Sequence, residues 1–337
     1  MPITINDVAK AAGVSKSTVS RVVNNIPVVD MDTKRRVLEV IKELGYSPND
    51  IARGLATKRT GTIGLIINDI TNPFFPELAR GVEDVMRAYN RNVFLCNTDG
   101  RPEREASYIQ LLFQKRVDGI IFASVRIGTT DLSALAKRNM PFVLAGRELS
   151  GHDADLVIVD NVLGGYQATR HLLDLGHTRI AFIAGTQGVS ASIDREKGYL
   201  KAMAEAGLAA DQCQIEAGDF KQEGGYAAAK RLLQTEKVPT AIFAANDLMA
   251  IGALEAIFEA GLRVPEDISL VGFDDIPPAS LHLVQLTTVA QPKYDIGAIA
   301  ARLLLEKIES PQAQREPQRI ILPPKLQIRK TSGFAPQ

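Results

Sequence analysis

The 337-residue sequence is poor in cysteine and has no long apolar run. Its two cysteines, Cys96 and Cys213, lie in apolar, strand-like segments, so we expect buried, reduced thiols rather than a disulfide or a nucleophile. No run approaches the roughly 18 apolar residues of a membrane-spanning helix, and the beginning of the chain lacks the apolar core of a signal peptide. These absences predict a cytoplasmic protein with no membrane partner.

Common signatures of enzymes and metal sites are also missing. The four histidines, His152, His171, His177 and His282, have no metal-ligand spacing. The sequence contains neither a G-x-S-x-G nucleophile turn nor a phosphate-binding P-loop, and GLIINDITNPF lacks the glycines of a dinucleotide site. We therefore expect no enzymatic activity, no metal and no cofactor.

The formal net charge of zero hides an uneven distribution along the chain. Residues 1–60 carry ten lysines and arginines against six aspartates and glutamates, whereas the rest carries 29 basic and 33 acidic residues. A small basic segment followed by a mildly acidic body indicates a polyanionic partner for the first segment alone.

The first 46 residues have the pattern of three short amphipathic helices. Thr4 begins a capping-box pattern, and Gly13 is a typical helix stop. Ser15 caps a second helix, and a third ends at Gly45. A glycine turn between the first two helices predicts a helix-turn-helix DNA-binding unit over residues 1–46.

The second helix of this unit has valines spaced to pack inward, while Lys16, Ser17 and Arg21 lie on other faces within its first two turns. Such residues suit a recognition helix that reads base edges in the major groove. On spacing alone, the alternative is a solvated three-helix bundle with no DNA role. Residues 47–60 follow as a predicted hinge and linker, with a helix over about 48–56 too short to be stable by itself.

From Thr62 onward, apolar strands alternate with amphipathic helices, which predicts parallel sheets with crossover helices. The strands fall into two groups on either side of about residue 161, so we expect residues 61–337 to form two doubly wound lobes with a ligand cleft between them. We assign lobe 1 to about 61–160 and 292–321, and lobe 2 to about 161–291 and 322–337.

Ordered motifs along nearly the whole chain resemble those of the lactose-repressor (LacI/GalR) family of bacterial transcription regulators. The first are ITINDVAKAAGVSKSTVSRVVNN and GYSPNDIARGLAT. Later ones are NPFF at 72–75, QKRVDGII at 114–121, LGHTRIAFIAG at 175–185, AANDLMAIGAL at 244–254, GLRVPEDISLVGFDD at 261–275 and LTTVAQP at 286–292. The resemblance implies an all-α helix-turn-helix headpiece joined to an α/β body like the periplasmic sugar-binding receptors.

The resemblance also implies a homodimer that pairs through its large lobes and binds a pseudo-palindromic operator. Hinge helices would enter the minor groove, where Leu55 matches the leucine that wedges into a base step; ordinary hydrophobic contact is the alternative for this residue. The candidate DNA-contacting residues are Thr4, Ser15, Lys16, Ser17, Thr18, Ser20, Arg21, Asn24, Asn49 and Leu55.

Matching the family's pocket positions one by one gives candidate residues for binding a small-molecule effector. Their aromatic rings and polar groups suit the apolar face and the hydroxyls of a sugar. They are Asn72, Phe74, Phe75, Arg147, Arg195, Phe220, Asn246, Asp274 and Gln291. Phe74 and Phe75 could instead be plain core residues, and Arg195 a surface charge. We expect Asp275 to serve structure rather than the ligand.

The stretch LAGR at 144–147 lacks a carboxylate that many sugar-binding members carry there. Arg147 and Arg195 would then face Asp274 alone, and a buried unpaired cation is costly. This charge count favours a sugar acid or phosphorylated sugar as the effector, with a neutral sugar as the runner-up.

The sequence thus predicts a ligand-responsive transcription regulator, by expectation a repressor, that acts as a homodimer. Two other classes compete with it. A sugar-binding receptor for transport would have a signal peptide and no helix-turn-helix unit. A DNA-architectural dimer would use its lobes only for pairing, and no small molecule would alter its operator binding.

Overall fold

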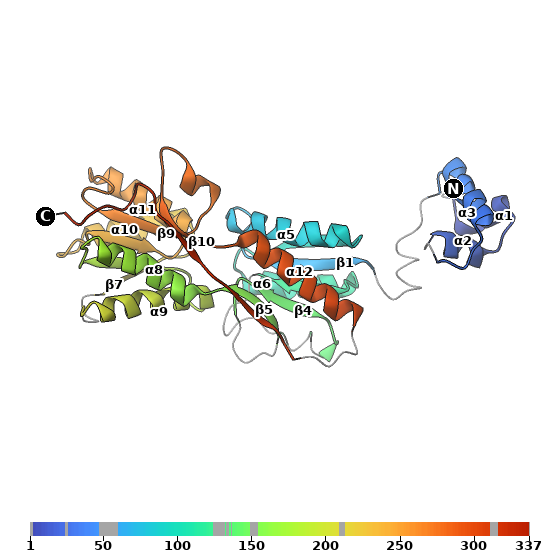
Figure 1. The fold of residues 1–337 in the computed structure, drawn as a ribbon, viewed down its shortest axis with the longest axis horizontal. Coiled ribbons are helices and arrows are strands. Elements are labelled where there is room, and N and C mark those ends of the chain that lie inside the picture. The colour runs from blue at the N-terminus through green and yellow to red at the C-terminus, as the bar shows by residue number, and fades with distance from the viewer. Residues whose placement is uncertain are drawn as a thin grey trace. The chain divides into compact units, whose positions relative to one another are not determined.

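The computed structural model describes residues 3–23, 26–46, 60–123, 132, 135, 137–148, 154–208, 213–310 and 316–336. The chain divides after Thr60 into two compact units, a helical headpiece and an α/β body that begins at Gly61 (Figure 1). Among the described residues, no helix combines the length and apolar character needed to cross a membrane.

The described part of the headpiece contains α1 (Ile5–Ala12), α2 (Lys16–Val23) and α3 (Met31–Leu44), packed around a small core of valines and alanines. The predicted capping box is confirmed, because the Thr4 hydroxyl accepts from the Asp7 N–H while the Asp7 carboxylate accepts from the Thr4 N–H. Gly13 and Gly45 end α1 and α3 with left-handed φ angles of 65° and 62°. The predicted hinge helix at 48–56 lies outside the described residues.

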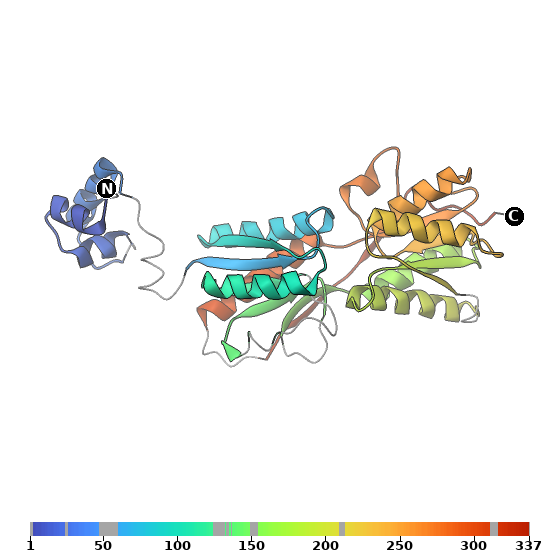
Figure 2. The same ribbon diagram turned by 180° about the vertical axis from the view of Figure 1, so that it is seen from behind.

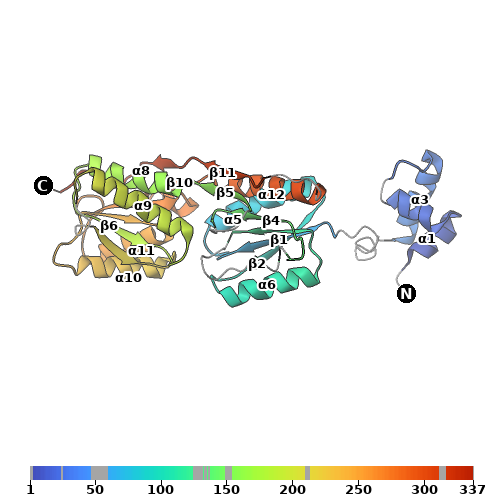
Figure 3. The same cartoon turned by 90° about the horizontal axis from the view of Figure 1, so that it is seen from below.

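Lobe 1 is a six-stranded parallel sheet with the strand order β11-β5-β4-β3-β1-β2. Helices α5 and α12 cover one face through a shared apolar core, and α6 covers the other (Figures 2 and 3). Its elements are β1 (Thr62–Ile67), α5 (Phe74–Ala88), β2 (Asn92–Asn97), α6 (Pro102–Gln114), β3 (Gly119–Phe122), β4 (Phe142–Ala145), β5 (Asp155–Val159), α12 (Lys293–Glu309) and β11 (Arg319–Leu322).

Lobe 2 is a second six-stranded sheet with the order β12-β10-β9-β8-β6-β7. Helices α8 and α9 lie on one face, and α10 and α11 on the other (Figure 3). Its elements are α8 (Asn161–Asp174), β6 (Ile180–Ala184), α9 (Ser190–Glu205), β7 (Gln214–Ala217), α10 (Gln222–Leu233), β8 (Ala241–Ala244), α11 (Asp247–Glu259), β9 (Ser269–Asp274), the 3-10 turn η2 (Pro277–Ser280), β10 (Thr287–Ala290) and β12 (Lys325–Gln327).

The expected pair of doubly wound sheets is confirmed, with one correction. Strand β12 runs antiparallel to β10, so the lobe 2 sheet is mixed. The reason is that β10 leads out of lobe 2 into α12 of lobe 1, whereas β12 enters lobe 2 directly from β11 of lobe 1, so the two strands run in opposite directions. Among the described elements, the chain passes between the lobes three times, from β5 to α8, from β10 to α12, and from β11 to β12.

Glycines set the spacing of the helix pairs beside these sheets. In α8 and α9, a Cβ at Gly165 would lie 2.3 Å from the Arg195 carbonyl oxygen, and one at Gly198 would lie 2.2 Å from the Val162 carbonyl oxygen. Equivalent close approaches occur at Gly81 and Gly297 between α5 and α12 and at Gly225 and Gly252 between α10 and α11. Each pair therefore needs a residue without a side chain on both helices, and in α9 this packing positions the backbone that carries Arg195.

Candidate functional site

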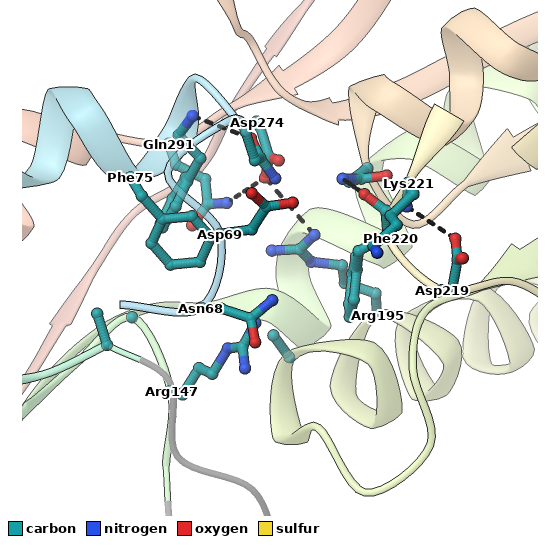
Figure 4. Close-up of a pocket in the computed structure, with 16 residues that line it drawn as sticks. Asn68, Asp69, Phe75, Arg147, Arg195, Asp219, Phe220, Lys221, Asp274 and Gln291 are labelled. Atoms are coloured by element: carbon teal, nitrogen blue, oxygen red, sulfur yellow. Dashed lines mark hydrogen bonds and ion pairs between the residues drawn. The ribbon is translucent and has the colours of Figure 1, made fainter. Parts of the chain in front are cut away.

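A pocket lies between the two lobes, where strands of both sheets have their carboxyl ends (Figure 4). The empty space between its lining residues, open solvent included, is about 560 Å³. All nine residues predicted to bind an effector line this one pocket. The lining also includes Asn68, Asp69, Ala123, Gly146, Ala191, Asp219 and Lys221.

The lobe 1 wall is formed by the turn that leads into α5. The Asn72 side chain accepts a 3.0 Å hydrogen bond from the Phe74 N–H, which fixes the start of the helix. The rings of Phe74 and Phe75 meet edge to face, with centroids 5.1 Å apart, and both side chains belong to the apolar core of the lobe. Phe74 and Phe75 are therefore both core residues and pocket-lining residues, because their packing in the core holds them against the pocket.

Arg195 is anchored within lobe 2 and is not a surface charge, being only 4% exposed. Its Nε donates to Asn161 Oδ1 at 2.9 Å, and its Nη1 donates to the Ala245 carbonyl oxygen. The guanidinium also stacks 3.7 Å above the Phe273 ring, a favourable cation–π contact. Burial lowers the pKa of Arg195 to about 10, with opposition from the charge of Asp274, so the group stays cationic at neutral pH.

Asp274 ends β9 with an unusual positive φ of 120° and has its carboxylate at the base of the pocket. Gln291 Nε2 donates to Asp274 Oδ1 at 2.6 Å, and Arg195 Nη1 lies 3.6 Å from the same oxygen. Burial raises the pKa of Asp274, while the positive charge of Arg195 acts in the opposite direction. The carboxylate is thus held by two side chains from different elements, before any ligand enters.

A second buried carboxyl, Asp247, lies near Asp274 and is not among the residues that line the pocket. It accepts from the Ile276 N–H at 2.9 Å and bonds to the Thr288 hydroxyl. Burial, followed by the nearby charge of Asp274, raises the pKa of Asp247 well above its usual range. Its bonds to the segment after β9 and to β10 indicate that it fixes the backbone next to Asp274.

On the opposite wall, Phe220 is half-buried and has a left-handed φ of 68°. The Asn246 side chain donates to the Phe220 carbonyl oxygen at 3.0 Å and accepts from the Met249 N–H, which caps α11. A Cβ at Gly185 would lie 2.1 Å from the Phe220 ring, so glycine is required there for the ring to take this position. The ring is therefore held by its packing and is available to stack on a ligand.

The sequence-based charge count of the pocket was wrong. The lining has three acidic residues, Asp69, Asp219 and Asp274, and three basic ones, Arg147, Arg195 and Lys221. Asp69 follows β1 and Asp219 follows β7, and residues after parallel strands gather at one edge of a sheet. Strand position was thus the signal for Asp69. Strand β7 (QIEA) was not predicted, because it alternates polar and apolar residues and so lacks an apolar run.

Asp275 does not line the pocket, and its expected structural role fits its contacts. Its carboxylate forms a 2.7 Å ion pair with Arg329, whose other nitrogen donates to the Leu286 carbonyl oxygen. Like Asp274, Asp275 has a positive φ, here 53°. The turn thus consists of two successive non-glycine residues in a backbone conformation that side chains disfavour.

The predicted DNA contacts are placed on the headpiece as far as they are described. Thr4, Ser15, Lys16, Ser17 and Arg21 are exposed, and Thr18 and Ser20 are half-buried. The Ser15 hydroxyl accepts from the Thr18 N–H at 3.1 Å, so it caps α2. Asn24, Asn49 and Leu55 lie outside the described residues.

The histidines and cysteines have other surroundings. Buried His177 bonds to the Thr240 and Ser269 hydroxyls and to the Gly333 carbonyl oxygen, joining the end of the chain to lobe 2. Over the described part of the chain, no three metal-ligating side chains gather into a site. Cys96 is a buried thiol outside any disulfide, as expected, whereas Cys213, which also forms no disulfide, is only half-buried.

Comparisons with known proteins agree with this architecture. Residues 4–49 match the model of bacterial regulatory proteins of the lacI family, and residues 60–330 match that of periplasmic binding proteins and the sugar-binding domain of the LacI family. Catabolite control protein A of Priestia megaterium is 42% identical over 90% of this chain and 92% of the relative, and the regulator DegA of Bacillus subtilis (strain 168) is 40% identical over 99% of both.

Solved structures give the same result. The lac repressor dimer bound to operator and an anti-inducer matches with a TM-score of 0.87 and 30% identity, over 99% of this chain and 100% of the other. A complex of the regulator CelR with cellobiose matches with a TM-score of 0.73 and 34% identity, over 98% and 99%. The chain therefore belongs to the LacI family of bacterial transcriptional regulators, which are DNA-binding proteins rather than enzymes.

Proposed function

We propose that this regulator binds a pseudo-palindromic operator as a homodimer and that a neutral sugar in the interlobe pocket controls its affinity for DNA. The headpiece supports the first part: α2 exposes Lys16, Ser17 and Arg21 on a small unit whose chain segment is net basic. A helix of this kind reads base edges, while capped helix ends and hydroxyl groups suit phosphates. As a repressor, the protein would block transcription when bound.

Exposed apolar side chains on the body support a dimer. Edge strand β2 carries Phe94 and Leu95, which are 46% and 43% exposed, and lobe 2 exposes Phe258, Leu281 and Leu283. An open apolar strand edge is a liability that a partner normally covers. We assign the contacts of these apolar side chains to a second copy of the chain, by analogy with the lac repressor dimer. Multi-angle light scattering of Leu283→Lys, expected to weaken the dimer, tests the assignment.

The choice of a neutral sugar over an anion follows from the charges. The earlier preference for a sugar acid required an excess of cations in the pocket, whereas acidic and basic residues are equal in number among its lining. Arg195 is already compensated by Asp274, Asn161 and the Ala245 carbonyl oxygen. An anionic ligand would have to compete with these contacts for Arg195. The hydroxyl groups of a neutral sugar, in contrast, can bond both to carboxylates and to amides.

The observation that carries this proposal is that two aromatic walls, Phe75 and Phe220, flank the compensated Arg195–Asp274 pair (Figure 4). Related regulators support it: one structure contains cellobiose and another, from Enterococcus faecium, contains ribose. Calorimetric titration against matched panels of neutral sugars, sugar acids and sugar phosphates tests it. Binding of only the acidic or phosphorylated members would contradict the neutral class and restore the anionic alternative.

A further inference from the structure

Lys293 is a buried cation at the junction of the lobes and does not line the pocket. It is the first residue of α12 in lobe 1, directly after the chain crosses from β10. Its side chain is only 5% exposed. A lysine buried to this extent is costly unless its three N–H donors find partners.

The partners of Lys293 come from both lobes. Its Nζ donates to the carbonyl oxygens of Asp274 at 2.8 Å and Asp275 at 2.9 Å, the last residue of β9 in lobe 2 and the residue after it. The same Nζ lies 3.4 Å from Glu77 Oε2, on α5 of lobe 1. One ammonium group therefore joins α12 and α5 to the turn that holds the pocket carboxylate.

The turn that Lys293 holds needs support. Both Asp274 and Asp275 have positive φ angles, a conformation that residues with side chains adopt at a cost. Gln291 and Arg329 fix the two carboxylates, while Lys293 binds the two backbone carbonyls. Because these carbonyls point to a charge on lobe 1, the turn cannot rotate with lobe 2 without moving or breaking the Lys293 contacts.

We propose that Lys293 is a positioning residue that fixes the angle between the lobes, by tying the Asp274–Asp275 turn of lobe 2 to α12 and α5 of lobe 1. On this basis, a displacement of Asp274 reaches lobe 1 through the Lys293 ammonium as well as through the covalent crossover. The inference concerns the body alone, and it stands whichever effector the pocket takes.

Lys293→Met provides the test, because methionine fills similar space without the charge. Pulsed electron paramagnetic resonance would measure the distance between spin labels at Leu111→Cys on α6 and Lys201→Cys on α9, both exposed positions in different lobes. The native cysteines are replaced by alanine, and labelled protein is diluted into excess unlabelled protein so that distances within one chain dominate. No effector is added.

The parent protein is expected to give one narrow distance distribution, and Lys293→Met a broader one with an added longer distance. Lys307→Met is the matched control, since Lys307 lies on the same helix but contacts Asp155 and Phe142, both in lobe 1. Its distribution should equal that of the parent.

Glu77→Gln keeps Lys293 and its carbonyl bonds but removes the lobe 1 charge, so it should broaden the distribution to a smaller extent. If Lys293→Met does not fold, the distance distribution of Glu77→Gln tests the proposal instead. Distributions of Lys293→Met and Glu77→Gln that superimpose on the parent, or equal broadening in Lys307→Met, would overturn the proposal. Neither result depends on which ligand or operator the protein binds.

Discussion

The guanidinium of Arg195 and the carboxylate of Asp274 lie 3.6 Å apart, with side chains only 5% and 6% exposed. Each charge is acceptable in the interior because the other is present, and removing one partner of such a pair is far more harmful than replacing both. Their placement at the pocket means that the charges an effector meets are arranged before it binds.

Arg195→Met should therefore destabilise the body strongly, by about 3–5 kcal/mol, because Asp274 would remain buried without its main cationic partner. Urea unfolding monitored by circular dichroism measures the change in the free energy of unfolding. Lys197→Met is the matched control, since Lys197 lies on the same helix but is 62% exposed, and it should change stability by less than about 0.5 kcal/mol. Equal losses in the two variants would argue against a special role for the buried pair.

Gly165→Ala should also destabilise the protein, although alanine normally favours a helix over glycine by up to about 1 kcal/mol. The added Cβ would lie 2.3 Å from the Arg195 carbonyl oxygen, so α8 and α9 must separate. We expect a lower melting temperature together with weaker effector binding, because Arg195 would move. A melting temperature equal to or above that of the parent would show that the helix contact is less tight than the structure indicates.

Stability should fall in mildly acidic solution because of His177. Burial lowers the pKa of His177 below its ordinary value of 6.5, so the unfolded chain binds its proton first as the pH falls. The stability that depends on the neutral imidazole is complete above pH 6.5 and is lost as the pH falls through the lowered pKa of the folded state. Nearby His171, whose pKa burial also lowers, acts in the same direction.

His177→Gln separates this effect from other titrating groups. At pH 7.5 the variant should be less stable by roughly 1–3 kcal/mol, because hydroxyl and carbonyl groups lose their partner. The deficit should shrink toward pH 5.5, as measured by urea unfolding at a series of pH values. A deficit independent of pH would mean that His177 does not contribute the predicted proton linkage.

Arg21→Ala should weaken operator binding by about 1–3 kcal/mol and reduce discrimination between operator and unrelated DNA, because Arg21 is an exposed cation on α2, the proposed recognition helix. Fluorescence anisotropy at two salt concentrations measures both quantities. Arg35→Ala, on α3 and paired with Asp32, is the comparison and should leave sequence preference unchanged. An unaltered preference in Arg21→Ala would exclude it as a base-reading residue.

The sequence predicted the headpiece well because its signals are local. Capping by Thr4 and Ser15 and the left-handed stops at Gly13 and Gly45 depend on residues within one or two turns. The pocket positions were found through the family resemblance, which the residue pattern alone could not replace. All nine line one cavity, although their roles in binding stay predictions.

What the sequence did not reveal depends on contacts between distant segments. The balance of charge in the pocket required Asp219 and Lys221 to be placed beside Arg147, more than 70 positions earlier in the chain. Lys293 gave no sequence signal, because a lysine at the start of a helix is ordinarily exposed. Strand β12 is only three residues long, and its antiparallel pairing depends on a direct connection between the lobes.

The most direct test of the account is the operator dissociation constant measured with and without each neutral sugar that raises the melting temperature of the full chain. We expect at least one such sugar to change operator affinity by about 5–150-fold. Phe220→Ala, which removes an aromatic wall of the pocket and leaves the Arg195–Asp274 pair intact, should weaken that response while operator binding without sugar persists. Operator affinity that stays the same with every sugar that binds would contradict the account and favour a dimer that only organises DNA.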